Sequence, residues 1–342
     1  MPIYIFAFTV ALIVAYFLTP HVKDFAIRAG ALDAPDDRKV HTRPIPRMGG
    51  LAIYVAFVLA VLASLHINRE IVGLLLGGTV ILIVGIIDDM RQLSARVKLI
   101  GQIVAAMVLV LFNVRIEWLT NPFGDMIYLN YFSIPLTILW VVSLTNTVNL
   151  IDGLDGLAAG VSTIASITIL LVALQQNFWT VAILTAALAG SALGFLQHNF
   201  NPAKIFMGDT GSMFLGYMLA AVSILGTVKS AATIALVVPI VALGLPIMDT
   251  AFAIIRRYTN GRPIFKPDKG HLHHRLLEMG LTQKQAVLLM YVISGCLGLS
   301  AIALTEVNKG YGALIILLLL GLAVLGARKV GVLKDTNSAE SN

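Results

Sequence analysis

Long apolar segments recur along nearly the whole chain, and short polar stretches separate them. We place eleven, at residues 2–20, 48–66, 71–87, 98–114, 131–148, 156–174, 179–197, 212–227, 231–252, 284–304 and 312–327. A helix needs about 20 residues, in a range of about 17 to 25, to cross roughly 30 Å of hydrocarbon. The pattern therefore predicts an all-α fold, a polytopic bundle of about 11 transmembrane helices in an integral membrane protein.

Composition supports this prediction. Of the 342 residues, 58% are hydrophobic and only 12% are charged, whereas about 25% of residues are charged in soluble domains. The only cysteine, Cys296, lies inside the tenth apolar segment, so neither a disulfide nor a thiolate metal site is expected. Basic residues follow the first apolar segment and no small-residue cleavage site is evident, so we expect this segment to remain as an anchor.

The chain shows no internal repeat and no long linker, so we expect a single transmembrane domain over residues 1–327. Its candidate active-site loops are residues 21–47, 88–98, 149–155, 198–211 and 253–283, and the polar tail 328–342 is expected to be disordered. GxxxG spacings occur at Gly73/Gly77 and Gly190/Gly194. Such spacings are typical of homodimer faces and of close helix packing within one bundle, and both interpretations remain open.

The distribution of basic residues predicts an orientation. Twenty of the 24 Lys and Arg residues lie in the tail or in segments that follow odd-numbered apolar segments. The positive-inside rule then places the amino terminus outside and the carboxyl terminus in the cytoplasm, in a multi-pass protein of the cell inner (plasma) membrane. The net charge of +6 lies in loops that flank the membrane, which favours membrane lipid and phosphorylated substrates as partners rather than nucleic acid.

Five aspartates lie at the ends of apolar segments on the predicted cytoplasmic side: Asp88, Asp89, Asp152, Asp155 and Asp209. A charged side chain near lipid costs about 2.5 to 3.5 kcal/mol at a helix centre on insertion scales. A single loop aspartate is explained by helix punctuation, but five on one side indicate an active site that faces the cytoplasm.

Three short motifs carry these acids. NLIDGLDGL begins at Asn149, and if it is helical it presents Asn149, Asp152 and Asp155 within one arc of about 120°. IFMGDTGS runs from Ile205 to Ser212 and places Asp209 at the start of an apolar segment, where a plain helix cap is the alternative reading. IIDDM ends the third apolar segment with two adjacent acids, which point about 100° apart on a helix and are expected to address different partners.

Two further motifs are basic. KPDKGHLHHRLLEMG contains three histidines within four positions on the acid-rich side, which favours a functional role over plain solvation. APDDRKVHTRPIPRMGG is what topology alone would give at an inner surface, so phosphate binding and a solvated loop both remain open. The basic residues and histidines of these motifs that we single out are Lys39, His41, Arg43, Arg47, His271, His273, His274 and Arg275.

Together the five motifs resemble those of the polyprenyl-phosphate N-acetylhexosamine-1-phosphate transferase family. The likeness covers the chain from about Asp33 to Glu278 and keeps the motifs in family order. The resemblance implies a reaction in which a UDP-sugar donates its sugar 1-phosphate to a lipid phosphate, which releases UMP and leaves a lipid diphosphate sugar.

The resemblance also implies a metal cofactor, Mg²⁺, with Mn²⁺ as an alternative. Two unit charges 4 Å apart repel by about 4 kcal/mol at an effective dielectric near 20, so acids that face a diphosphate need a cation between them. By the resemblance, Asp209 is the principal metal ligand, and Asp88 and Asp89 supplement the metal field and handle the lipid phosphate. The implied catalytic set is completed by His273 and His274, which would hold the diphosphate or the sugar.

The resemblance assigns the remaining site residues to the substrates. Asn149, Asp152, Asp155 and Asn199 would form the nucleotide pocket, with Phe206 stacking on uracil. Lys98, in SARVKLIGQ, would meet the lipid phosphate from the membrane side. The implied phosphate and sugar contacts are Lys39, His41, Arg43, Arg47, His271 and Arg275.

One departure from the family pattern favours a particular donor. MurNAc-pentapeptide transferases carry three consecutive histidines, whereas here Arg275 follows His274. HLHHRLLEMGLTQKQ instead resembles enzymes that transfer GlcNAc 1-phosphate from UDP-GlcNAc to undecaprenyl phosphate. The resemblance thus implies the first membrane step in the synthesis of a cell-wall polymer, either teichoic acid or a lipopolysaccharide of the O-antigen type. A phospho-MurNAc-pentapeptide transferase of peptidoglycan synthesis is the alternative, and a secondary transporter is a more distant one.

Overall fold

The computed structural model describes residues 1–33, 44–119, 127–228, 234–261, 270–307 and 309–332. Its first half contains α1 (Ile3–Arg28), β1 (Leu32–Asp33), β2 (Ile45–Pro46), α2 (Gly50–Ser64), α3 (Arg69–Arg91), α4 (Ala95–Leu111), β3 (Trp118–Leu119), β4 (Ile127–Tyr128), η1 (Asn130–Phe132) and α5 (Ser133–Ile151). The second half contains α6 (Leu157–Gln175), α7 (Trp179–Asn199), α8 (Gly208–Val228), α9 (Ile234–Ala242), α10 (Gly244–Thr259), α11 (Leu272–Glu278), α12 (Gln283–Ala303) and α13 (Lys309–Val330).

The predicted polytopic helical membrane fold is confirmed. Seven helical stretches in the described part of the chain are long and apolar enough to cross a membrane: Ile3–Arg28, Arg69–Arg91, Asn130–Ile151, Leu157–Gln175, Trp179–Asn199, Gly208–Gly226 and Gln283–Ala303. The short strands form two antiparallel pairs, β1 with β2 and β3 with β4. The count of eleven spans and their orientation stay predictions.

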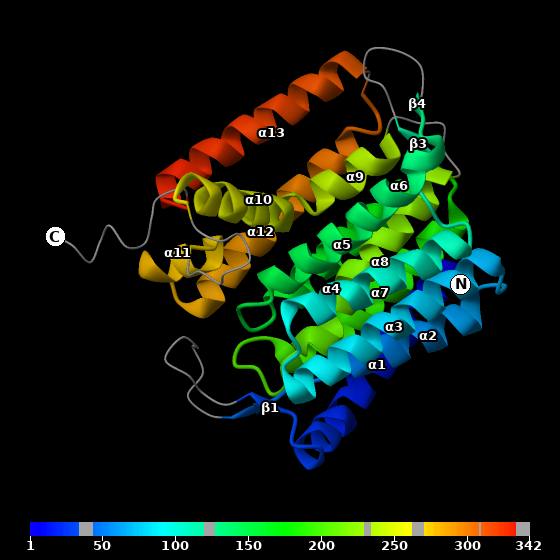
Figure 1. Cartoon of the computed structure of the whole chain (residues 1–342), viewed down its shortest axis with the longest axis vertical. Helices are drawn as coiled ribbons and strands as arrows, with labels where there is room; N and C mark the ends of the chain where they lie inside the picture. The colour runs from blue at the N-terminus through cyan, green and yellow to red at the C-terminus, as the bar shows by residue number, and fades with distance from the viewer. Residues whose placement is uncertain (34–43, 120–126, 229–233, 262–269, 308, 333–342) are drawn as a thin grey trace.

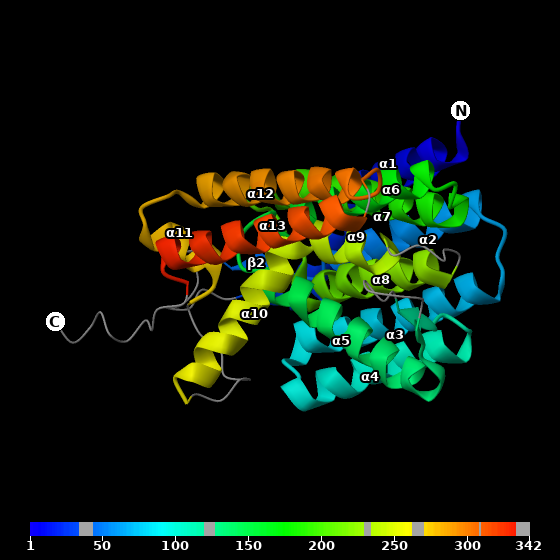
Figure 2. The ribbon, with the colours of Figure 1, turned by 90° about the horizontal axis from the view of Figure 1, so that it is seen from above.

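The ninth apolar segment, expected as one helix over residues 231–252, is divided instead. Its described part forms α9 and α10, with Leu243 between them. Pro246 explains the break because it lacks the N–H that would bond to the carbonyl of Ala242, and its ring would clash with that carbonyl in a continuous helix. Figure 2 shows α10 leaving the bundle at an angle to α12 and α13.

A proline inside α1 is tolerated for a specific reason. Pro20 cannot donate to the carbonyl of Tyr16, four residues earlier, yet α1 continues to Arg28. Nε2 of His198, on α7, lies 2.9 Å from this carbonyl oxygen and satisfies it. The contact between α1 and α7 therefore replaces the hydrogen bond that Pro20 cannot make.

Glycines bring helices of the same chain into close contact. A Cβ added at Gly190 would lie 2.2 Å from the Phe8 carbonyl oxygen, and one at Gly194 would lie 2.4 Å from that of Leu12, both on α1. Gly73 and Gly77 pack in the same way against Phe112 and Tyr217. The reading of these GxxxG spacings as a homodimer face is therefore wrong, because packing within the bundle already uses them. A homodimer formed through another surface stays a prediction.

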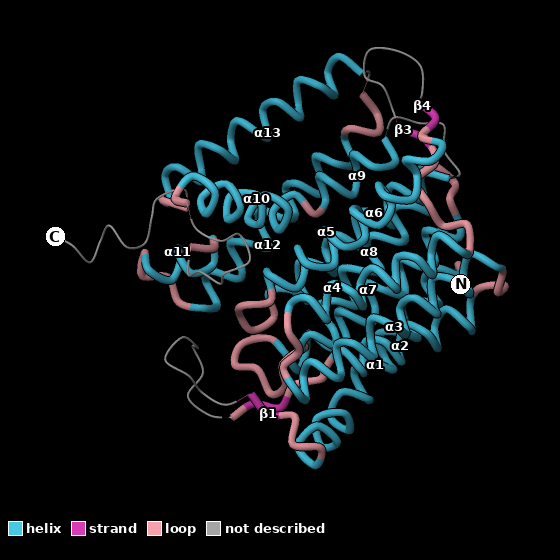
Figure 3. Tube along the Cα trace, in the orientation of Figure 1, coloured by secondary structure: helices cyan, strands magenta, loops and turns pink. Residues whose placement is uncertain are grey.

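The loops that carry the acidic motifs gather at one end of the bundle. Figure 1 and Figure 3 show the loops after α3, α5 and α7 at the end where α11 lies, whereas the amino terminus and the β3–β4 pair lie at the opposite end. The last turn of α13 lies at the α11 end as well. Acids from three different helix ends are therefore placed on one side of the molecule.

Candidate active site

The first part of the site forms where α3 ends and α8 begins. These two helices pack along each other, so Asp88 and Asp89 in the last turn of α3 face Asp209 in the first turn of α8. Glycine permits this approach: Gly208 has φ +71°, and a Cβ there would lie 2.3 Å from the Asp89 carboxylate. The packing of α3 against α8 therefore brings together acids that lie far apart in the sequence.

Asp89 is bound to the amino-terminal turn of α8. Its Oδ1 accepts the backbone N–H of Asp209 at 3.0 Å, and its Oδ2 accepts the N–H and the hydroxyl of Thr210 at 3.1 and 2.5 Å. A carboxylate is favourable at a helix amino terminus because the N–H groups there have no partner within the helix. Both oxygens are thus engaged by α8, which gives Asp89 a positioning role. The predicted role of Asp89 as a metal ligand is untested.

Lys98, from α4, bridges the other two acids of this cluster. Its Nζ lies 2.8 Å from Oδ2 of Asp209 and 3.3 Å from Oδ2 of Asp88. The Asp88 carboxylate is held in place by its other oxygen, which accepts the N–H of Leu93 at 2.7 Å. An ammonium group therefore occupies the point between two carboxylates, where a cation lowers their mutual repulsion.

The NLIDGLDGL motif is a turn and not the continuous helix that would place its polar residues on one arc. Helix α5 ends at Ile151, and Gly156 has φ +80°, a conformation that glycine adopts without strain. Asn149, in the last turn of α5, donates to the Ser212 hydroxyl of α8 at 2.9 Å. This bond places the turn beside the acidic cluster, where burial first, and then the charges of Asp209, Asp89 and Asp155, raise the pKa of Asp152 to about 8.

Asp155 and Asn199 organise the backbone beside this turn. Asp155 accepts hydrogen bonds at 3.0 Å from the Asn201 amide and from the backbone N–H of Ala203. Asn199 is buried, accepts the N–H of Gly156 at 3.0 Å and donates to the Ile205 carbonyl at 3.0 Å. These bonds hold the 149–156 and 199–205 segments together, so both residues shape the predicted nucleotide pocket. Direct contact with the nucleotide stays a prediction for each.

Two further predicted residues lie near the same end. Phe206 is half-buried, and its backbone pairs with Pro46 and Gly49 through hydrogen bonds of 2.8 and 3.0 Å. Arg47 pairs with Asp33, and its Nη1 lies 4.0 Å from Oδ1 of Asp89. The β1–β2 segment thus brings one guanidinium group to the acidic cluster. Lys39, His41 and Arg43 lie outside the described residues.

The histidine segment lies against the NLIDGLDGL turn. His273 is buried, and a Cβ added at Gly153 would lie 2.4 Å from its Nε2. Its ring stacks on that of His271 with centroids 5.9 Å apart and lies 4.2 Å from that of His274. Burial first, and then the charge of His274, lower the pKa of His273 to about 3. The side chain is therefore a neutral imidazole at physiological pH.

His274 and Arg275 also lie on this short helix, α11. Arg275 donates to Glu278, one turn along α11, at 2.9 Å. The structure thus brings the histidine segment to the acid-rich turn, and it joins Asp88, Asp89, Lys98, Asn149, Asp152 and Asp209 in one cluster at the end of the bundle. Contacts of His274 and Arg275 with substrate stay predictions.

Only a few carboxylates of this site are candidate metal ligands. Among the residues that the structure describes, no group of three or more His, Cys, Asp or Glu side chains is arranged to hold a metal ion. Mg²⁺ is commonly held by one or two carboxylates together with substrate phosphates and water. Asp88 and Asp209 fit that requirement, since both already coordinate the ammonium group of Lys98.

The motifs did not single out three residues that this site uses. Thr210 and Ser212 lie inside IFMGDTGS, where Asp209 alone was assigned a role, and they bond to Asp89 and Asn149. Asp249 lies outside every motif and pairs with His271 at 2.8 Å. The signal that would have found it is an isolated acid inside the ninth apolar segment, where an ionisable residue is costly without a partner.

The fold and the site define a class, a polytopic helical membrane protein with acids from three helix ends gathered at one end of the bundle. Comparison with known proteins gives the family. Residues 71–227 match the family model described as glycosyl transferase family 4. Similarity extends well beyond that match, and the chain belongs to this family.

Three relatives show the range of the similarity. The chain is 44% identical to the "Probable undecaprenyl-phosphate N-acetylglucosaminyl 1-phosphate transferase" of Bacillus subtilis (strain 168), over 96% of this chain and 92% of that protein. It is 40% identical to the "Decaprenyl-phosphate N-acetylglucosaminephosphotransferase" of Mycolicibacterium smegmatis, over 93% and 85%. It is 33% identical to a "Phospho-N-acetylmuramoyl-pentapeptide-transferase" of Caldanaerobacter subterraneus, over 84% and 93%.

Proposed function

We propose that this protein transfers GlcNAc 1-phosphate from UDP-GlcNAc to undecaprenyl phosphate. An oxygen of the lipid phosphate forms a bond to the sugar-bearing phosphorus, the bond from that phosphorus to the bridging oxygen breaks, and UMP leaves with the bridging oxygen. The product, undecaprenyl-diphosphate-GlcNAc, would begin a cell-wall polymer of the teichoic acid or O-antigen type. The Bacillus subtilis relative, which is similar over 96% of this chain, is named for this activity.

The observation that carries the proposal is the bridge from Lys98 to Asp88 and Asp209. Phosphoryl transfer asks a protein to position polyanions and to neutralise developing charge. Lys98 reaches the acids from α4, so a lipid phosphate at that helix would meet its ammonium group while the carboxylates hold a cation. The arrangement suits two phosphate groups that must approach each other.

Mg²⁺ is proposed as the cofactor, with Asp209 as its principal ligand and Asp88 as the second. When bound, it would supply positive charge to the diphosphate and to the transferring phosphoryl group. Asp89 would act by holding the first turn of α8, and therefore the Asp209 backbone, in place. The donor set suits Mg²⁺ because it consists of hard carboxylate oxygens. Mn²⁺ accepts the same ligands.

Asp88 is better suited to orienting the lipid phosphate than to removing a proton from it. A phosphate monoester has its second pKa near 6 and is largely dianionic at pH 7, whereas an ordinary Asp titrates near 3.9. The attacking oxygen therefore needs to be placed and to have its charge compensated, and it does not need a base. The ammonium group of Lys98, which lies beside Asp88 and Asp209, would place this oxygen and compensate its charge.

The turn after α5 and the histidine segment are proposed to bind the donor. Nδ1 of His273 is buried and has no hydrogen-bond partner among the described residues. A neutral imidazole beside Gly153 can donate a hydrogen bond to a diphosphate or sugar oxygen. Asn149, Asp152 and Phe206 line the neighbouring turns, where they would contact the nucleotide. The donor is cytoplasmic, so this end of the bundle would face the cytoplasm in the plasma membrane.

A donor comparison tests the proposal. Purified protein with undecaprenyl phosphate and Mg²⁺ should release UMP from UDP-GlcNAc at least tenfold faster than from UDP-MurNAc-pentapeptide. Asp209→Asn should lose nearly all turnover at any practical Mg²⁺ concentration while it still inserts and folds. Preference for the pentapeptide donor would establish the rival activity, for which the 33% identical relative is named. Solute transport across liposomes without any UMP release would contradict both.

A further inference from the structure

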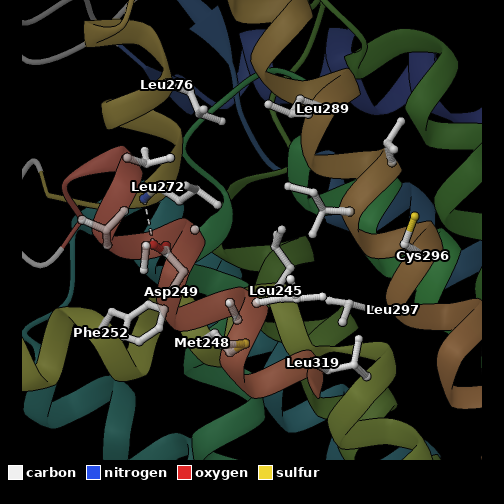
Figure 4. Close-up of a pocket in the computed structure, with 18 residues that line it drawn as sticks. Leu245, Met248, Asp249, Phe252, Leu272, Leu276, Leu289, Cys296, Leu297 and Leu319 are labelled. Atoms are coloured by element: carbon white, nitrogen blue, oxygen red, sulfur yellow. Dashed lines mark hydrogen bonds between the residues drawn. The ribbon is translucent and has the colours of Figure 1, made fainter. Parts of the chain in front are cut away.

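Asp249 is a buried acid on α10 that the proposed chemistry does not use. It lies six residues into α10 and is 4% exposed. Figure 4 shows it on the wall of a cavity of about 390 Å³, which is otherwise lined largely by apolar side chains such as Leu245, Met248 and Leu297. A carboxylate in such surroundings is costly unless it is hydrogen-bonded. Its partners therefore indicate what it does.

Both carboxylate oxygens of Asp249 are engaged by the histidine segment. Oδ2 lies 2.8 Å from Nδ1 of His271, and Oδ1 accepts the backbone N–H of Leu272 at 2.8 Å. Figure 4 draws the bond to Leu272. Leu272 is the first residue of α11, so its N–H has no partner within that helix. One side chain of α10 thus fixes the start of α11 and the ring orientation of the preceding histidine.

A second side chain of α10 holds the same segment. Arg256 is buried, donates from Nη1 to the Gly270 carbonyl at 2.8 Å and also bonds to the carbonyl of Val332. The contact at Gly270 is close, since a Cβ there would lie 2.2 Å from the guanidinium carbon. Asp249 and Arg256 are seven residues apart and therefore lie on one face of α10. Residues 270–272 are thus fixed at two points by one helix.

This attachment extends to the acid-rich turn through the rings of the histidines. The ring of His271, held by Asp249, stacks on that of His273 with an interplanar angle of 12°. The His273 ring in turn rests against Gly153 of the NLIDGLDGL turn. A shift of His271 would therefore move the imidazole whose Nδ1 faces no described protein partner. The cavity offers Asp249 no such connection, because the other side chains that line it are largely apolar.

We propose that Asp249 is a positioning residue for sugar-phosphate transfer, which holds the His271–Leu272 backbone so that His273 meets the donor diphosphate. The proposal rests on the proposed function for its catalytic consequence, whereas the placement of the segment can be measured without turnover. Residue 249 would touch no substrate, and its effect would pass entirely through the histidine segment.

Hydrogen exchange tests the placement directly. In Asp249→Asn the side chain keeps one acceptor oxygen but replaces the other with an NH₂ group, which cannot accept from His271. Amides of residues 270–278 should exchange at least tenfold faster in this variant, while those of α3, α5 and α8 should be unchanged. Met248→Leu, a volume-conserving change in the same cavity wall, serves as the matched control and should alter neither region. Unchanged exchange over residues 270–278 in Asp249→Asn would overturn the proposal.

Kinetics of UMP release test the consequence. Asp249→Asn should lower kcat by roughly 10- to 100-fold, since a displacement of about 1 Å at a positioned group can cost about 100-fold, with KM for UDP-GlcNAc changed less than threefold. Asp249→Glu should recover part of the loss. In a His273→Ala background, Asp249→Asn should lower kcat by less than twofold further, because the group it positions is gone. Fully additive losses would contradict the proposal. An inactive wild type with faster exchange in the variant would count against the proposed function alone.

Discussion

The carboxylate of Asp89 holds the backbone of Asp209: its Oδ1 accepts the Asp209 N–H at 3.0 Å, while the Asp209 side chain turns to Lys98. Two adjacent acids of one motif therefore have different tasks. Asp88 shares the ammonium group of Lys98 with Asp209, whereas Asp89 fixes the helix that carries Asp209. This division separates a role in stability from the proposed role in metal binding, and each can be tested.

Asp89→Ala should destabilise the protein more than it weakens metal binding. The change removes the acceptors of two backbone N–H groups at the start of α8, and loss of such a cap costs about 0.5 to 2 kcal/mol. Thermal unfolding in detergent should show a melting temperature lowered by several degrees. Asp209→Asn, which leaves these bonds in place, is the matched control. Unchanged stability of Asp89→Ala together with lost Mg²⁺ binding would instead favour Asp89 as a metal ligand.

Lys98→Met should make the protein depend more strongly on Mg²⁺. In the wild type, the ammonium group offsets the repulsion between Asp88 and Asp209. Without it the two carboxylates repel until a divalent cation arrives, so binding should stabilise the variant more. The measurement is the rise in melting temperature between EDTA and 10 mM Mg²⁺, which should be larger in Lys98→Met than in the wild type. An equal rise in both would separate Lys98 from the cation site.

Gly190→Leu should disrupt the contact between α1 and α7. A Cβ at this position would lie 2.2 Å from the Phe8 carbonyl oxygen, so the helices must move apart. Overpacking of this kind costs about 1 to 3 kcal/mol, and the melting temperature should fall. Gly321→Leu on α13 is the control, since open space surrounds that position. A variant that changed from dimer to monomer without loss of thermal stability would restore the dimer-face interpretation.

Much of the fold follows from the sequence because hydrophobic length sets helix length. The apolar pattern predicts α3, α5, α6 and α7 to within a few residues of their observed bounds. The prediction of a single helix for the ninth segment is wrong because a hydrophobic pattern does not reveal that Pro246 lacks an N–H. The apolar pattern predicts a loop after residue 20, whereas α1 continues to Arg28 and His198 bonds to the carbonyl that Pro20 leaves free. That compensation depends on a helix about 180 residues away and has no local signal.

The sequence predicted several acids of the candidate site, but it missed Thr210, Ser212 and Asp249 and did not predict the tasks of the members. Asp88, Asp152 and Asp209 could be predicted because they are acids at the ends of apolar segments on the same predicted side of the membrane, and the structure brings them together. The tasks of Asp89 and Asn199 depend on backbone groups of other segments, which a motif does not display. The helical arc predicted for NLIDGLDGL is wrong because α5 ends at Ile151 and Gly156 adopts φ +80°, a left-handed conformation that interrupts a helix.

His273 should make stability fall as the pH drops. Burial lowers the pKa of this imidazole to about 3 in the folded protein, against about 6.5 in the unfolded chain. The unfolded state therefore binds the proton more readily between pH 6.5 and 3, so stability is complete above pH 6.5 and decreases below it. At pH 5 the loss attributable to His273 is about 2 kcal/mol. His273→Gln removes this titration, so its melting temperature should fall less than that of the wild type between pH 7.5 and 5. Parallel losses in the two proteins would mean that His273 is protonated as readily in the folded state as in the unfolded one.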